Sequence, residues 1–103
     1  MKITEENFNE IQNTGKPVMI KFGASWCGPC RTLAPTIEEL EKEYEGKALV
    51  GDVDVAEEEN LAGNFGIRNV PTILFFDKNG QRVDKCVGLA SKAVLEAKLN
   101  SLL

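Results

Sequence analysis

The sequence predicts an α/β fold, with a central mixed sheet of four to five strands flanked by helices and an antiparallel hairpin near the C-terminus. Strand-like and helix-like patterns alternate along the chain, as they do in βαβ units. Two strand-like runs late in the chain flank an Asn-Gly pair, which is the signature of a tight hairpin. The length of 103 residues is that of one ordinary domain, so we expect a single domain over residues 1–103.

The chain is expected to start with a helix and then a buried strand. Thr4, followed by two glutamates, is typical of a helix start, and Gly15 of a helix stop. Residues 18–22 are β-branched, aromatic or apolar except for Lys21, which predicts a strand covered on both faces. A lysine in such a strand needs a partner or a path to water.

Further elements follow from the same kinds of pattern. A helix after the cysteines is expected to bend at Pro35, where a backbone hydrogen bond is lost, and its apolar face comprises Leu33, Ile37, Leu40 and Tyr44. A last helix, capped by Ser91, would bear Val94, Leu95, Leu99 and Leu102. Between them we expect a strand at 48–55, a helix at 58–65, a loop at 66–71, a strand at 72–76, a turn at 77–80 and a strand at 81–87.

Composition and charge exclude several classes of partner. The formal net charge is -4 and the chain has no long cluster of Lys and Arg, which argues against nucleic acid and anionic membranes as partners. No apolar run approaches the ~20 residues that span a bilayer. The chain also becomes acidic where a secretory signal would turn apolar. We therefore expect a cytoplasmic protein.

Cys27 and Cys30 are separated by two residues where a predicted strand gives way to a predicted helix. Backbone N–H groups and the helix dipole at such a position stabilise a thiolate, which is the form that attacks disulfides. A free cysteine with a pKa of ~8.5 is only ~3% ionised at pH 7, so this stabilisation has a large effect. The spacing places Cys30 within one helical turn of Cys27, so it can resolve a mixed disulfide formed there.

Two other uses of the cysteine pair are a metal site and a haem attachment site. A closed zinc site needs about four ligands, and this chain has no histidine and only one further cysteine. Haem attachment requires a histidine at the position of Arg31. We therefore favour redox chemistry over metal binding or two unremarkable core cysteines.

The run Trp26-Cys27-Gly28-Pro29-Cys30, followed five residues later by Pro35, resembles the active-site signature of the thioredoxin family. Residues 66–72 are similar to the family's loop with a cis proline, here Pro71, and Asn79-Gly80 and Val87-Gly88 match in order. The resemblance extends over nearly the whole chain, although only residues 1–3 remain for the family's first strand.

The resemblance implies the thioredoxin fold and a protein-disulfide reductase that cycles between a dithiol and a Cys27–Cys30 disulfide. Cys27 would be the exposed nucleophile and Cys30 the buried resolving thiol, and the Gly-Pro between them favours a reductant. The implied partners are disulfide-containing proteins and a flavin-dependent thioredoxin reductase. We expect a monomer with no cofactor or metal. The implied docking surface comprises Trp26, Gly28, Pro29, Val70, Pro71, Val87 and Gly88.

One pair of positions departs from the family pattern. Thioredoxins usually carry a buried aspartate six residues before the nucleophile and a lysine on the neighbouring strand, whereas here the two positions hold Lys21 and Asp52. We expect these two residues to form a charge pair, because an unpaired lysine in a buried strand is costly. Asp54 is a rival partner, and both side chains could instead reach solvent separately. Asp52 is the candidate general base for the buried thiol.

Cys86 is the third cysteine of the chain and lies far from the pair in sequence. Cys86 is expected on an edge strand, partly exposed and on the same face as Arg82 and Asp84. It is either a passive residue or a regulatory or intermolecular thiol.

As alternatives to the reductase, the same fold could serve as a binding subunit without a redox cycle, or work in reverse as an oxidase or isomerase.

Overall fold

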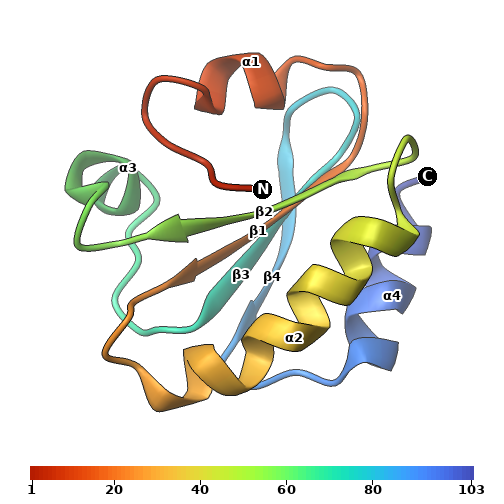
Figure 1. The fold of residues 1–103 in the computed structure, drawn as a ribbon. Coiled ribbons are helices and arrows are strands. Elements are labelled where there is room, and N and C mark those ends of the chain that lie inside the picture. Colours follow the sequence, from red (N-terminus) through yellow and green to blue (C-terminus); the bar gives the residue numbers. More distant parts are fainter.

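A four-stranded mixed sheet with the strand order β2-β1-β3-β4 forms the centre of the computed structural model, which describes residues 1–103 (Figure 1). β1 pairs with β2 in parallel, and the pairs β1–β3 and β3–β4 are antiparallel. The predicted mixed sheet and C-terminal hairpin are confirmed. In chain order the elements are α1 (Phe8–Gln12), β1 (Val18–Gly23), α2 (Gly28–Glu43), β2 (Leu49–Asp54), α3 (Glu59–Asn64), β3 (Thr72–Phe76), β4 (Arg82–Val87) and α4 (Lys92–Asn100).

Helices cover both faces of this sheet, with α2 and α4 on one face and α1 and α3 on the other (Figure 1). Side chains alternate accordingly along the central strands: Met19 packs into the cluster under α2 and α4, whereas Ile20 packs into the cluster on the other face. In β3, Phe75 and Phe76 divide between the same two clusters. The central strands are therefore buried on both sides, as their nearly continuous apolarity predicts. None of the helices has the length and apolarity to cross a membrane.

The first three residues form a short additional pairing with the outer edge of β2. The Ile3 amide donates to the Asp52 carbonyl at 2.8 Å, and the Asp52 amide donates to the Met1 carbonyl at 2.9 Å. This single bridge between Lys2 and Asp52 involves the three residues that the resemblance leaves for the family's first strand. α1 begins later than predicted, because Thr4 and Asn7 bond each other through side chain and backbone before the helix starts.

The two long helices follow their predicted forms except at Val94. α2 continues through Pro35 to Glu43, and Pro35 lies on its exposed side. Ser91 caps α4 as predicted, by accepting the Val94 amide at 3.2 Å. Val94 itself was expected on the apolar face and is exposed instead, because Leu95 and Leu99 already fill the contact with the sheet. Most other boundaries lie within one or two residues of the predicted ones.

Candidate active site

Cys27 occupies the N-cap position of α2. β1 ends at Gly23, a short loop follows, and Cys27 has an extended backbone with φ -91° and ψ 113° before the helix begins at Gly28. Its Sγ accepts the backbone N–H of Cys30 at 3.2 Å. Pro29 lies in the first turn, where its missing N–H is not needed. The predicted position of the thiol at a helix N-terminus is confirmed, and one N–H group already points at the sulfur.

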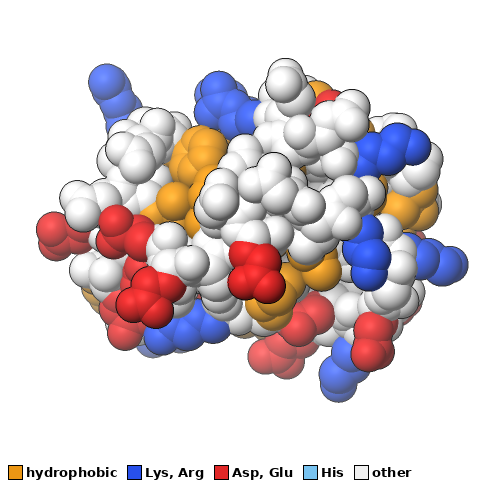
Figure 2. All heavy atoms as spheres, turned by 90° about the horizontal axis from the view of Figure 1, so that it is seen from above, with side chains coloured by type: hydrophobic (Ala, Val, Ile, Leu, Met, Phe, Trp, Pro, Cys, Tyr) orange, Lys and Arg blue, Asp and Glu red, His pale blue; other side chains and the backbone are white.

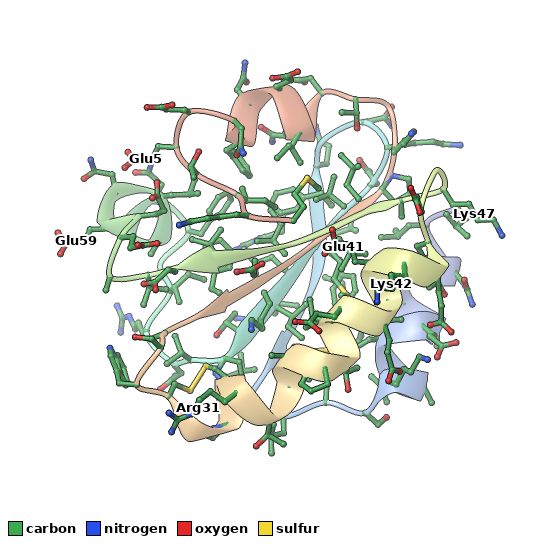
Figure 3. The ribbon with its side chains drawn as sticks, viewed as in Figure 1. Glu5, Arg31, Glu41, Lys42, Lys47 and Glu59 are labelled. Carbon is green, nitrogen blue, oxygen red and sulfur yellow. A yellow bond between two sulfur atoms is a disulfide. The ribbon has the colours of Figure 1, made fainter.

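Cys27 and Cys30 are joined by a disulfide, with their Cα atoms 5.3 Å apart. Figure 3 shows the bond at the N-terminal end of α2, beside Arg31. Cys27 is 6% exposed and Cys30 is 3% exposed. The expectation of an exposed Cys27 beside a buried Cys30 is therefore wrong for the oxidised chain. Both cysteines pack with Ala24, and Val55 and Val70 cover this small cluster.

The loop before β3 meets the disulfide at Val70. The Val70–Pro71 peptide bond is cis, as the resemblance implies. Cys27 Sγ lies 3.7 Å from the Val70 carbonyl oxygen. The next carbonyl, that of Pro71, accepts the Gly88 amide at 2.8 Å. These contacts connect three segments that are distant in sequence: the start of α2, the loop before β3 and the end of β4.

The seven residues of the expected docking surface differ in accessibility. Trp26 is 70% exposed and Val87 is 55% exposed. Gly28 and Pro29 are also exposed, Val70 and Gly88 are half-buried, and Pro71 is buried. An exposed aromatic ring and an exposed valine thus lie on the two segments that border the disulfide. Pro71 itself offers no side-chain surface to solvent.

Lys21 and Asp52 are partners in the register of β1 and β2, and both are half-buried. They line a cavity of about 220 Å³ together with Cys30, Arg31 and Asp54. The ion pairs of the molecule do not include a bond from Lys21 to either carboxylate. The expected direct pair is therefore not formed. The cavity opens to solvent, so water can solvate each charge without the other.

Gly23 is a site residue that the sequence reasoning missed. A Cβ atom at this position would lie 3.1 Å from Cys30 Sγ and 3.5 Å from Lys21 Cε. Lys21 and Cys30 thus approach the same small space above the Gly23 backbone. Glycine at the end of a strand often marks such a close approach, and that signal was present in the sequence.

Cys86 lies on edge strand β4, is half-buried and packs against the apolar cluster under α2 and α4. Burial raises the pKa of its thiol. On the same side of β4, Asp84 pairs with Lys98 of α4 at 2.6 Å. The side-chain hydrogen bond from Lys98 lowers the pKa of the Asp84 carboxyl. The predicted partial exposure of Cys86 and its shared face with Asp84 are confirmed.

Arg82, in contrast, does not share that face. The register shifts between Phe75 and Phe76, so that Phe75 pairs with Asp84 whereas Phe76 pairs with Arg82. The extra residue is Val83, and it turns Arg82 to the opposite side of the strand. The simple alternation assumed from the sequence fails at this bulge.

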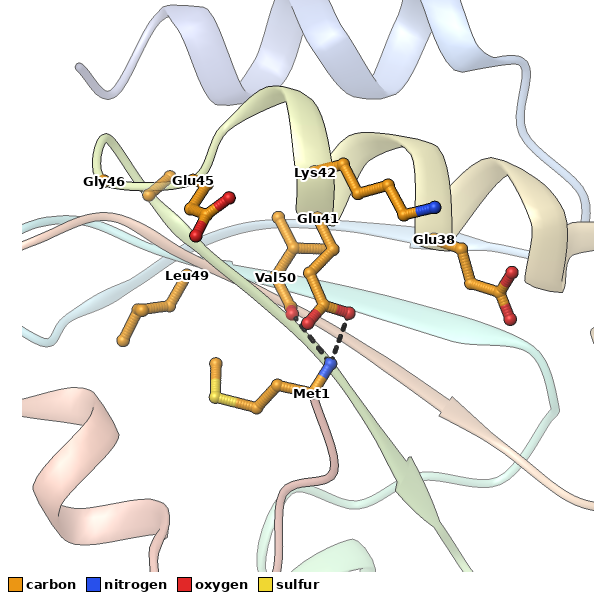
Figure 4. Close-up of a pocket in the computed structure, with 9 residues that line it drawn as sticks. Met1, Glu38, Glu41, Lys42, Glu45, Gly46, Leu49 and Val50 are labelled. Atoms are coloured by element: carbon orange, nitrogen blue, oxygen red, sulfur yellow. Dashed lines mark hydrogen bonds and ion pairs between the residues drawn. The ribbon is translucent and has the colours of Figure 1, made fainter.

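The largest cavity, of about 430 Å³, lies away from the disulfide, between the N-terminus, the second half of α2 and the start of β2. The Met1 amine bonds a Glu41 carboxylate oxygen and the Val50 carbonyl oxygen there (Figure 4). Its nearest α2 residue, Glu38, is eight residues from Cys30, or about 12 Å along the helix. This cavity therefore forms where the N-terminus is bound to α2 and β2.

Acidic and basic side chains are mixed over the α1 end of the molecule (Figure 2).

Comparisons with known proteins agree with this geometry. A family model described as Thioredoxin matches residues 1–101. A curated thioredoxin from Chlorobaculum thiosulfatiphilum is 45% identical over 98 residues, which cover 94% of this chain and 90% of the relative. A chloroplastic M-type thioredoxin from Pisum sativum is 49% identical over 83 residues, 81% of this chain and 48% of the relative.

A solved structure is similar over almost the full chain. It is a mutant thioredoxin from Halobacterium salinarum, with a TM-score of 0.89 and 32% sequence identity. The match covers 98% of this chain and 87% of that one.

Proposed function

Since the chain belongs to the thioredoxin family and is a thiol–disulfide oxidoreductase acting on protein disulfides, we propose that Cys27 is its nucleophile and Cys30 its resolving thiol. One observation carries this assignment: Cys27 Sγ is the N-cap acceptor of α2 and receives the Cys30 N–H at 3.2 Å. When the disulfide is reduced, the same N–H group and the helix dipole stabilise a thiolate on Cys27. Cys30 has no comparable place at the helix terminus, since it already lies within the first turn.

The reaction cycle transfers two electrons. The Cys27 thiolate attacks one sulfur of a substrate disulfide, that disulfide breaks, and the released substrate thiolate takes a proton. Cys30 then attacks Cys27 Sγ, which releases the second substrate thiolate and leaves the Cys27–Cys30 disulfide. The 5.3 Å between the two Cα atoms allows this second step without movement of the helix. The substrate is reduced and the chain is oxidised by the same pair of electrons.

Substrate proteins dock on the surface formed by Trp26, Gly28, Pro29, Val70, Pro71, Val87 and Gly88. The exposure of Trp26 and Val87 supports this part of the proposal. Both cysteines are nearly covered in the oxidised chain. Covered cysteines leave little for the reduced substrate to hold, which favours its release. When the Cys27–Cys30 bond opens, Cys27 Sγ is free to turn outward.

Asp52 accepts the proton of the Cys30 thiol during the second step. Its place in the cavity that Cys30 also lines supports this role. A water molecule in that solvent-open space can relay the proton between the two groups. Lys21 lines the same cavity and is the register partner of Asp52, with no direct bond between the two side chains.

We propose the direction of the cycle and its setting by analogy with the family. A flavin-dependent thioredoxin reductase restores the dithiol, and the chain acts as a monomeric reductant, one domain over residues 1–103. The match of the family model to residues 1–101 supports the single domain. The proposed location is cytoplasmic, whereas the M-type relative from Pisum sativum is described as chloroplastic.

The test is reduction of insulin disulfides with electrons supplied by a flavin-dependent thioredoxin reductase. The intact chain should turn over, Cys27→Ser should be inactive, and Cys30→Ser should accumulate a mixed disulfide with the substrate. Cys86→Ser is the matched control and should retain the activity of the intact chain. Full activity of Cys27→Ser would contradict the assignment.

A further inference from the structure

Three cationic side chains line one groove on the α3 side of the sheet. The groove has a volume of about 160 Å³, and Arg68, Arg82 and Lys85 contribute to its wall. Phe65 and Leu74 belong to its apolar floor. Aspartate and glutamate are absent from its lining, although the chain has 16 acidic residues against 12 basic ones. The groove is thus a local region of positive charge on a protein with a net charge of -4.

The bulge at Val83 creates this arrangement. Arg82 and Lys85 are three residues apart, so a regular strand would place them on opposite faces. The register shift pairs Arg82 with Phe76 and Lys85 with Leu74. Phe76 and Leu74 belong to the same apolar cluster on the α1 and α3 side. Both cations therefore point to one side of the sheet, where Arg68 from the loop after α3 joins them.

The three cations are not neutralised within the protein. All three are exposed, and the ion pairs of the molecule involve the N-terminus, Lys2, Lys92 and Lys98 instead. The nearest acidic residue of β4, Asp84, lies on the other face with Lys98. Nothing in the fold requires three unpaired charges around one groove, and their mutual repulsion is a cost that a partner can offset.

The groove adjoins the proposed docking surface. Val87 belongs to both, and Arg68 is two residues before Val70, whose carbonyl oxygen lies 3.7 Å from Cys27 Sγ. With a rise of about 3.3 Å per residue, Lys85 lies about 7 Å and Arg82 about 16 Å along β4 from Val87. An extended substrate segment of about five residues therefore spans the groove from Val87, on the proposed docking surface, to Arg82.

We propose that this groove binds an acidic segment flanking the target disulfide of a substrate protein, and so gives the reductase a preference for acidic substrates. The inference rests on the proposed function and adds a substrate class to it. Charge complementarity identifies the occupant, because the groove offers three cations and no anion. The free edge of β4 lies beside the same groove, so an extended segment also finds unpaired backbone groups there.

The experiment compares three disulfide-containing peptides that differ only in four flanking residues on each side: glutamate, glutamine or lysine. Pre-reduced protein is mixed with each peptide, and acid-quenched samples are separated by chromatography. Reduction of each peptide consumes two electrons and two protons from the Cys27–Cys30 dithiol. We expect the glutamate peptide to react about tenfold faster than the glutamine peptide at low salt, with the difference shrinking at high salt.

Two triple variants separate the groove from general charge effects. Arg68→Gln, Arg82→Gln and Lys85→Gln together should bring the ratio of the glutamate and glutamine rates close to one. Lys42→Gln, Lys47→Gln and Lys78→Gln remove the same charge from exposed, unpaired lysines elsewhere and should preserve the ratio. Equal loss in both variants, or no preference in the intact chain, would overturn the inference. Failure to reduce any peptide would instead overturn the proposed function.

Discussion

Lys21 and Asp52 are register partners on adjacent strands, yet their charged groups do not form an ion pair. Both line the cavity that reaches Cys30, with Arg31 from α2 and Asp54 from β2 on the same wall. Two cations and two carboxylates therefore line the cavity that Cys30 also lines. The proposed resolving step would release the Cys30 proton into this water-accessible cavity, and each of the four charged groups can be tested separately.

Replacing Asp52 with asparagine should slow release of the mixed disulfide more than its formation. A general base contributes to the step in which Cys30 loses its proton, and its removal should slow that step about 100-fold or more. Stopped-flow measurement of the two phases over about pH 6 to 9 checks this. Asp54→Asn is the control, since it retains the oxygen that bonds the Ala56 and Glu57 amides. Unchanged resolution kinetics in Asp52→Asn would exclude the role.

Replacing Lys21 with methionine should make ionisation of Cys30 harder. Lys21 Cε and Cys30 Sγ lie 3.5 Å and 3.1 Å from the same point above Gly23, so these two atoms are less than about 7 Å apart. The ammonium group is one bond beyond Cε, and a nearby cation favours the thiolate over the thiol. In a background without Cys27 and Cys86, the ultraviolet absorbance of the thiolate should appear at higher pH in Lys21→Met. Arg31→Gln, an exposed cation of the same cavity, should have a smaller effect. Coincident titration curves for Lys21→Met and its parent would contradict the prediction.

The order of helices and strands and the redox-active cysteine pair could be predicted from the sequence, because both depend on local signals. Alternating apolar residues define the central strands, and two cysteines three positions apart at a helix start define the chemistry. Such signals need no knowledge of tertiary contacts. The thioredoxin resemblance adds the cis proline, which no propensity would indicate.

Features that depend on contacts between distant segments could not be predicted in the same way. The bulge at Val83 arises from pairing between β3 and β4. It places Arg82 on the face of the sheet opposite to the one that strict alternation along β4 predicts. The absence of a Lys21–Asp52 bond depends on whether water reaches the cavity. The burial of Cys27 depends on Val70, a residue from a separate loop. In each case the prediction followed correctly from the local sequence, but contacts with a distant segment or with solvent determine where the side chain lies.

Cys86 should behave as an unreactive thiol. Its pKa is raised by burial, so the thiolate, which is the reactive form, is present only at a pH above that of an ordinary cysteine. In Cys27→Ser, Cys30→Ser protein, alkylation of Cys86 by iodoacetamide near pH 8 should be about tenfold slower than that of a small free thiol. The rate should rise to the free-thiol value when the protein is unfolded in denaturant. A dimer band that disappears on reduction would show instead that Cys86 forms intermolecular disulfides.

Replacing Gly51 with alanine should destabilise the fold by loosening the N-terminal segment. An added Cβ would lie 2.5 Å from Ile3 Cδ1 and 2.7 Å from the Met1 carbonyl oxygen, and the latter atom accepts the Asp52 amide. The segment must move, so we expect the free energy of unfolding to fall by about 1–3 kcal/mol, measured by chemical denaturation. Gly63→Ala is the matched control: it lies in α3 with nothing within 4 Å of the added atom, so stability should rise by about 0.5–1 kcal/mol. If Gly51→Ala were as stable as the parent, the pairing of Met1 and Ile3 with β2 would contribute little to the fold.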